Sequence, residues 1–262
     1  MELIDTHCHL DFPVFDADRE ALLTRWRQLG VGEYIIPAVG EENWGRVMAL
    51  AGRHDDIRYG LGIHPWYVGK QPRDALTRLE TLLASRPRGL VAVGECGLDL
   101  RSHVPQEGQV EMFEAQVRLA MAHELPLIVH SVRANDTVAK ILRRFTPPQG
   151  GVIHAFSGSL HQAEVFWQLG FRLGIGGVIS YERANKTREA IRQMPLEALL
   201  LETDAPDMPL QGQQGEVNTP ASLPTIARLL AQLRQQPLED VISVLHDSTR
   251  RLFPPGNHEI NI

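Results

Sequence analysis

The stretch LIDTHCHLD, residues 3–11, begins with a short apolar run and continues with side chains that can bind metal. Leu3 to Asp5 is typical of a short buried strand, and His7 and His9 follow it, two positions apart. On an extended segment such positions point to the same side, so both imidazoles can reach one ion while Cys8 points away. The stretch therefore predicts a strand whose carboxyl end carries a metal-binding pair.

Short apolar runs that end in a polar or glycine-containing turn recur along the whole chain. We expect strands at Leu3 to Asp5, Tyr34 to Val39, Arg58 to Ile63, Leu90 to Gly94, Leu127 to His130, Val152 to His154, Arg172 to Ile175 and Leu199 to Glu202. Between them the apolar residues fall three or four positions apart, as in 113–121 and 223–233, which is typical of helices with one apolar face.

Alternating strands and helices predict a parallel sheet. Eight such units in 262 residues indicate a (β/α)8 TIM barrel, an α/β fold, with a last helix from about Leu238 to Phe253. An open doubly wound sheet is the alternative, but it would more naturally carry a glycine-rich nucleotide loop after its first strand, and that loop is absent. We expect one domain, residues 1–262.

Composition limits the kinds of function that are possible. No apolar stretch approaches the ~20 residues that a membrane span requires, and the N-terminus lacks the features of a signal peptide. We therefore expect a cytoplasmic protein with no membrane association, and no obligate protein partner is evident.

Cys8 and Cys96 are expected to be reduced and buried. The net charge of −6 argues against wrapping a long duplex, although bound cations can supply local positive charge.

Polar residues also occur at the carboxyl ends of other predicted strands, where barrel enzymes place their active sites. Glu95 follows the fourth strand, His130 and His154 end the fifth and sixth, and Asp204 follows the eighth. One such histidine alone is more often structural, but the set predicts a metal site. Imidazoles and carboxylates suit zinc, manganese or magnesium. Glu95 is placed to bridge two ions, and Asp204 could be a ligand, a general base, or both.

Six segments, in order along nearly the whole chain, carry a family resemblance. They are IDTHCHLD at 4–11, GIHP at 62–65, VGECGLD at 93–99, PLIVHS at 126–131, HAFSGS at 154–159 and LLETDAPDMP at 200–209. In these segments the chain resembles the TatD family of metal-dependent deoxyribonucleases. The resemblance implies a two-metal nuclease in which Asp204 and Glu95 are catalytic and His64 contacts substrate phosphate. The implied metal ligands are His7, His9, Glu95, His130, His154 and Asp204.

The chain departs from the family pattern at positions that the resemblance implies are near the substrate. The family commonly has a second histidine where this chain has Trp66, and often an arginine where it has Val132, so that Arg133 comes one residue late. Arg133 is a candidate substrate-binding residue, although side chains alternate along an extended segment, so that it can face elsewhere unless the loop rearranges. Leu100 replaces a frequent aromatic residue. The metal ligands are intact, while the residues around the substrate are altered.

Several loop residues are candidates for substrate binding, each with a structural alternative. The amides of Ser157 and Gly158 could bind phosphate at a helix N-terminus, or Ser157 or Ser159 could simply cap that helix. Asp207 and Asn218 could contact substrate, although turns also favour these residue types.

Four further residues are expected near the site. Glu202 and Asp99 could orient a histidine ligand or play a purely structural part. Trp66 and Tyr67 could stack on a base or cover the barrel mouth. The remaining histidines are expected to be exposed to solvent: His54, His103, His123, His161, His246 and His258.

The leading hypothesis is a phosphodiesterase that uses a metal-activated water at single-stranded DNA or RNA ends. A hydrolase of an amide, ester or lactone is the alternative, since the same metal centre can polarise a carbonyl group. A non-catalytic scaffold would predict degraded ligands, and all of them are present.

Overall fold

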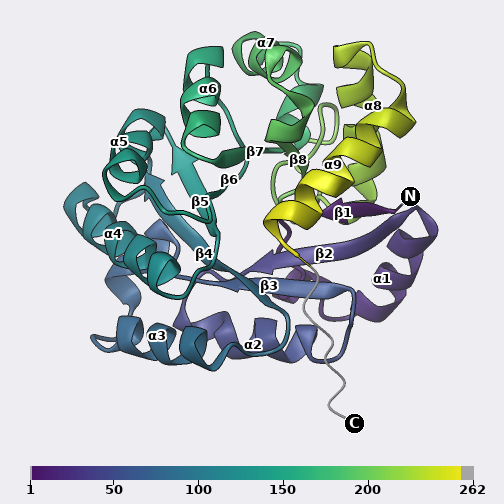
Figure 1. The fold of residues 1–262 in the computed structure, drawn as a ribbon. Helices are drawn as coiled ribbons and strands as arrows, with labels where there is room; N and C mark the ends of the chain where they lie inside the picture. The colour runs from purple at the N-terminus through teal and green to yellow at the C-terminus, as the bar shows by residue number, and fades with distance from the viewer. Residues whose placement is uncertain (1, 255–262) are drawn as a thin grey trace.

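Strands and helices alternate along residues 2–254, the part of the chain that the structure, a computed structural model, describes (Figure 1). The strands are β1 (Leu3–Asp5), β2 (Val31–Pro37), β3 (Ile57–Leu61), β4 (Leu90–Asp99), β5 (Leu127–Val132), β6 (Gly151–Ile153), β7 (Phe171–Ile175) and β8 (Leu199–Leu201). The α-helices are α1 (Arg19–Gln28), α2 (Glu41–Ala51), α3 (Ala75–Ser85), α4 (Gln106–Ala122), α5 (Asn135–Phe145), α6 (Leu160–Gln168), α7 (Asn185–Gln193), α8 (Leu223–Arg234) and α9 (Leu238–Leu252).

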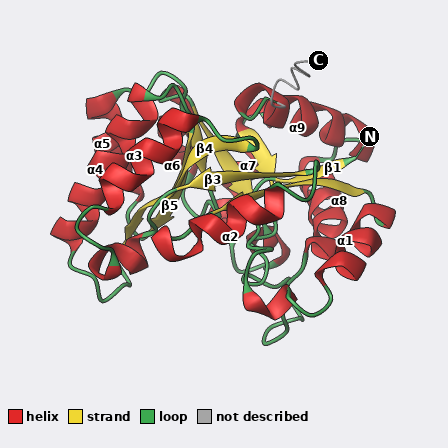
Figure 2. Cartoon of the chain, turned by 90° about the horizontal axis from the view of Figure 1, so that it is seen from below, coloured by secondary structure: helices red, strands yellow, loops and turns green. Residues whose placement is uncertain are grey.

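The strands pair in parallel, in chain order from β1 to β8, and the helices surround them (Figures 1 and 2). Hydrogen bonds close the sheet on itself: the amide of Thr6 donates to the Leu201 carbonyl at 3.0 Å, and the Asp5 carboxylate accepts from the amide and hydroxyl of Thr203 at 3.0 and 2.6 Å. The predicted TIM barrel is confirmed.

The barrel interior changes from apolar to polar along its axis. Ile128, Val152 and Leu200 point inward and pack with Leu252 and Phe253 at the end of α9, which closes the amino end of the barrel. Side chains two positions apart on a strand share a face. The next inward positions along the same segments are therefore polar: His130 on β5, His154 directly after β6 and Glu202 directly after β8.

The predicted strands are all present, but β4 is longer than expected, since it continues to Asp99 where we predicted an end at Gly94. Beyond Gly94 it still pairs with β5, with Cys96 opposite Val129. Gly97, whose φ is +135°, allows this pairing, because a Cβ there would lie 2.0 Å from the His130 carbonyl oxygen. Glu95, which we predicted to follow the fourth strand, thus lies within it, and His130, predicted as the last residue of the fifth strand, is followed by two more residues of β5.

The other predicted bounds lie within three residues of the observed ones, and the largest difference is at β2, which begins at Val31 where we predicted Tyr34. The last helix ends at Leu252, one residue before the expected end. The predicted domain includes Met1 and residues 255–262, which lie outside the described residues. Within the described part of the chain, no helix is both long and apolar enough to cross a bilayer.

Candidate metal centre

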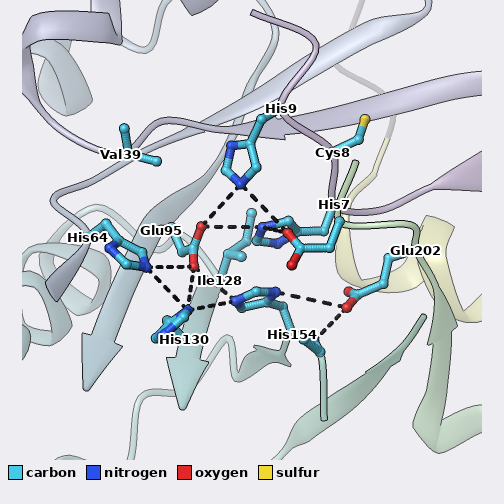
Figure 3. Close-up of polar contacts among 12 residues, drawn as sticks. His7, Cys8, His9, Val39, His64, Glu95, Ile128, His130, His154 and Glu202 are labelled. Atoms are coloured by element: carbon cyan, nitrogen blue, oxygen red, sulfur yellow. Dashed lines mark hydrogen bonds and ion pairs between the residues drawn. The ribbon is translucent and has the colours of Figure 1, made fainter. Parts of the chain in front are cut away.

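Glu95 lies at the centre of a buried group of histidines at the carboxyl end of the barrel (Figure 3). Its Oε2 atom is 3.3 Å from His7 Nε2 and 3.7 Å from His9 Nε2. Asp204 Oδ1 lies 3.4 and 3.7 Å from the same two nitrogens. Cys8 points away from the group, as the alternation of an extended segment predicts.

The other oxygen of Glu95 faces a second set of imidazoles. Oε1 is 2.8 Å from His130 Nδ1, 2.9 Å from His154 Nε2 and 3.4 Å from His64 Nε2. The nitrogens of His130 and His154 lie only 3.0 Å apart. The two oxygens of one carboxylate therefore serve two separate groups of ligand atoms.

The donor atoms of this cluster fit a cation. Both ring nitrogens of His7 are buried without a hydrogen-bond partner, although the residue is fully inside the protein. Three combinations bring their ligand atoms within 4.8 Å of one another: His7, His9 and Glu95; His64, Glu95 and His130; and His7, His154 and Glu202. Buried nitrogen and oxygen lone pairs that converge in this way suit a divalent metal.

The charges agree with that assignment. Burial alone would raise the pKa of Glu95, but the imidazoles of His154, His64 and His7 hold it well below the usual range. Burial lowers the pKa of His7 well below its usual range and that of His64 to about 3. Burial opposes a charge on His154 too, yet the Glu95 carboxylate raises the pKa of His154 to about 10. The cluster thus has an ionised carboxylate at its centre and a proton that a metal can displace.

Two further carboxylates contact the histidines from behind. Asp99 Oδ2 is 3.2 Å from His130 Nε2, so a hydrogen on that nitrogen leaves Nδ1 free to face Glu95. Glu202 is fully buried, accepts a hydrogen bond from the Ala155 amide, and lies 3.9 Å from His154 Nδ1. Asp99 is therefore placed to orient His130, whereas Glu202 lies beyond hydrogen-bond distance of His154 Nδ1, which has no hydrogen-bond partner among the described residues.

Two glutamines that are absent from the predicted site hold loops near the cluster. The Gln116 side chain accepts from the Ile63 amide at 2.7 Å and donates to the Ile63 carbonyl at 3.0 Å, and Gln109 bonds both backbone groups of Asp99 in the same way at 2.8 and 3.1 Å. They are seven residues apart on α4 and so share one helix face. Two amide side chains at this spacing on a buried face are the signal that could have identified them.

The structure places the predicted substrate residues in different surroundings. Arg133 is exposed directly after β5, and Ser157 is exposed before α6. A phosphate site on the Gly158 amide, one of the two possibilities for this segment, is not supported, since that amide donates to Thr187 Oγ1 at 3.2 Å. Ser159, one of the two capping candidates, is the N-cap of α6.

The structure also does not support the predicted contact of Asn218 with substrate. Only 3% of it is exposed, and its side-chain amide donates to the carbonyls of Thr203 and Asp207 at 2.9 and 2.8 Å, while its oxygen accepts from Thr219 and Ser222. No polar atom is left for a substrate, so Asn218 instead fixes the loop after β8. Asp207, in the same loop, is exposed.

The remaining cysteine and histidine predictions are met in part. Cys8 and Cys96 are buried and free of disulfide bonds. His103 and His161 are exposed, whereas the other described surface histidines are half-buried: His54, His123 and His246. His258 lies outside the described residues.

A closed α/β barrel with an inward cluster of histidines and carboxylates is typical of metal-dependent enzymes, and the relatives of this chain are metal-dependent hydrolases. The chain belongs to the TatD-related DNase family, whose sequence model matches residues 4–254.

Three relatives illustrate the range of the family. The chain is 47% identical to YjjV of Escherichia coli strain K12, described as an uncharacterized metal-dependent hydrolase, over 95% of this chain and 97% of that protein. The crystal structure of YjjV has the same fold, with a TM-score of 0.93 over 96% of this chain and 97% of that one. An uncharacterized metal-dependent hydrolase of Haemophilus influenzae is 36% identical over 97% of this chain and 100% of its own length. The 3′-5′ ssDNA/RNA exonuclease TatD of Pantoea ananatis is 29% identical over 96% and 99%.

Proposed function

We propose that the chain is a divalent-metal-dependent phosphodiesterase that shortens single-stranded DNA or RNA from an end. The observation that carries the proposal is the position of Glu95, whose two oxygens each face a separate set of ligand atoms at 2.8 to 3.7 Å. A carboxylate in this position suits a pair of ions, and paired ions suit phosphodiester cleavage. The exonuclease of Pantoea ananatis supports the choice of substrate.

The residues divide into two groups of ligands that share Glu95. His7, His9 and Asp204 would hold one ion with Oε2, and His130 and His154 would hold the other with Oε1. Two bound divalent ions, whether zinc, manganese or magnesium, would neutralise phosphate charge and lower the pKa of the attacking water.

Asp204 is the best candidate for the group that takes the proton of that water. Its side chain is 14% exposed, whereas that of Glu95 is 2% exposed. Asp204 is therefore the carboxylate of the pair that water can reach, which a general base requires.

His64 fits a contact to substrate phosphate better than a place among the ligands. Its Nδ1 atom accepts a hydrogen bond from the Trp66 amide at 3.1 Å, so in the neutral ring Nε2 carries the hydrogen. A nitrogen that carries hydrogen can donate to a phosphate oxygen, and Nε2 is the atom that faces the cluster. On the exposed rim, Arg133 would contact a further phosphate, and Ser157 and Asp207 would bond sugar or base groups.

The test uses metal-free protein reloaded separately with magnesium, manganese and zinc, and incubated with single-stranded DNA and RNA oligonucleotides that have a free 3′-hydroxyl. We expect a ladder of shortened products with at least one metal. The Asp204→Asn protein, purified in parallel, controls for contaminating nucleases. Intact oligonucleotides with all three metals would refute the proposal, and turnover of esters, amides or lactones in the same preparation would favour the alternative hydrolase.

A further inference from the structure

Trp66 combines large exposure with a fixed position. The side chain is 54% exposed, at the start of the short 3-10 helix η2 (Pro65–Lys70) that follows β3. Its indole nitrogen nevertheless donates a hydrogen bond to Asp99 Oδ2 at 2.7 Å, and its ring meets the His64 ring edge to face, with centroids 5.4 Å apart. The indole is thus held in one orientation while much of its surface faces solvent.

Asp99 connects the indole to the candidate metal centre. This buried carboxylate also accepts from His130 Nε2 at 3.2 Å and from the Arg101 amide at 2.8 Å. The indole is therefore separated from the His130 ring by a single carboxylate. A group bound to the cluster would lie close to the indole.

Apolar surface gathers on the same end of the barrel. Among residues 2–254, the exposed large hydrophobic residues are Val14, Leu29, Trp66, Leu100, Met208 and Val217. All except Leu29, which precedes β2, lie in segments that follow β1, β3, β4 or β8, at the end that holds the cluster. Phosphate and sugar groups are polar and gain little from contact with an apolar surface, whereas a flat aromatic ring gains from burial against it.

We propose that Trp66 binds the substrate by stacking on a base of the nucleic-acid end whose phosphate lies at the cluster. This inference rests on the proposed phosphodiesterase function and extends it to a preference for a base at a defined position. Stacking tolerates any base, because every base has an aromatic face. The rim then grips the substrate through its bases, which suits a chain with a net charge of −6.

The experiment compares an ordinary single-stranded oligonucleotide with two versions that carry an abasic sugar at the last or the second-last 3′ position. For the wild-type protein, kcat/KM should fall about 5- to 150-fold at one of these positions. Trp66→Ala should lose a similar factor on the ordinary oligonucleotide, mainly through KM, and should no longer distinguish the abasic version. Trp66→Phe keeps an aromatic ring without the indole nitrogen and should retain most of the discrimination.

Leu29→Ala is the matched control, because Leu29 is 48% exposed at the opposite end of the barrel, and it should behave as wild type. Equal discrimination by the wild-type and Trp66→Ala proteins would overturn the stacking role. So would an equal loss of kcat and of bound metal in the Ala and Phe variants, which would assign Trp66 to the positioning of Asp99. If the wild-type protein cleaves no oligonucleotide at all, the proposed function fails, and this inference fails with it.

Discussion

Asp204 enters the cluster in an unusual backbone conformation. Its φ is +57°, in the left-handed region that residues with side chains seldom adopt. Arg133 and Ala155, which follow β5 and β6 near the cluster, share this feature, with φ of +54° and +44°. Such conformations persist where the surrounding structure enforces them, and they concentrate at functional sites. At Asp204 the backbone directs the carboxylate toward His7 and His9.

Replacement of Asp204 by Asn should abolish most turnover without unfolding the protein. Asn keeps the shape and tolerates a positive φ, but it cannot accept the proton of the attacking water. We expect kcat on oligonucleotides to fall about 10²- to 10⁴-fold. Asp247→Asn, on α9 with a side chain that is 62% exposed, is the control and should change kcat little. A wild-type rate in the Asp204 variant would remove this residue from the mechanism.

Glu202→Gln tests the carboxylate behind His154. Gln can still accept the hydrogen bond from the Ala155 amide, but it replaces the carboxyl group 3.9 Å from His154 Nδ1, whose pKa burial raises to about 8, by an amide that cannot ionise when a metal binds. Changes of this kind typically weaken metal binding 10- to 100-fold. Competition with a chromogenic chelator measures the affinity, and the exposed Glu197→Gln provides the reference. Equal affinities in the two variants would make Glu202 a purely structural acid.

At the level of elements, β4 determines the shape of the site. It carries Glu95 and Asp99, and at Gly97 it passes so close to β5 that a Cβ would overlap the His130 backbone. Gly174 on β7 leaves room for a site residue in the same way, because a Cβ there would lie 2.1 Å from Glu202 Oε2. The histidines and carboxylates therefore depend on glycines in the neighbouring strands.

Gly97→Ala should destabilise the protein and displace His130. The added methyl group must push β4 and β5 apart, and overpacking of this kind costs about 1 to 3 kcal/mol, in addition to the strain of a positive φ. The free energy of unfolding in urea gives the measurement. Gly45→Ala in α2, where a Cβ meets nothing within 4 Å, should instead gain about 0.5 to 1 kcal/mol. Equal stability of the Gly97 variant and wild type would show that the strands can separate without cost.

The sequence predicted the elements well because their apolar runs and helical stripes are local patterns. It misplaced the end of β4, since Gly94 and Gly97 are the residue type that usually weakens a strand. It also assigned Asn218 to the substrate, because loop composition does not reveal which groups fold inward. The position of His64 beside Glu95 depends on η2 and on Gln116, which lies far away in the sequence. Contacts of that kind cannot be read from the chain alone.

At the scale of the whole molecule, metal binding and folding should be linked. The cluster joins β1, β4, β5, β6 and the segment after β8, so an ion held there would connect strands around most of the barrel. A ligand at one hundred times its Kd adds about 2.7 kcal/mol per site, or roughly 5 to 10 °C in Tm for a protein of this size. Thermal unfolding with and without a chelator tests this.

The control for that measurement is Glu95→Gln, in which added metal should raise Tm much less than in wild type. If neither the chelator nor added metal changes the Tm of the wild-type protein, metal binding at the cluster does not stabilise the fold.

The central claim is that the two oxygens of Glu95 are shared between two divalent ions. Diffraction from crystals of the metal-loaded protein, recorded on both sides of the absorption edge of manganese or zinc, tests it most directly. We predict one anomalous peak among His7, His9, Asp204 and Oε2, and a second among His130, His154 and Oε1. Loaded crystals without anomalous density at Glu95, or with density only elsewhere on the molecule, would contradict it.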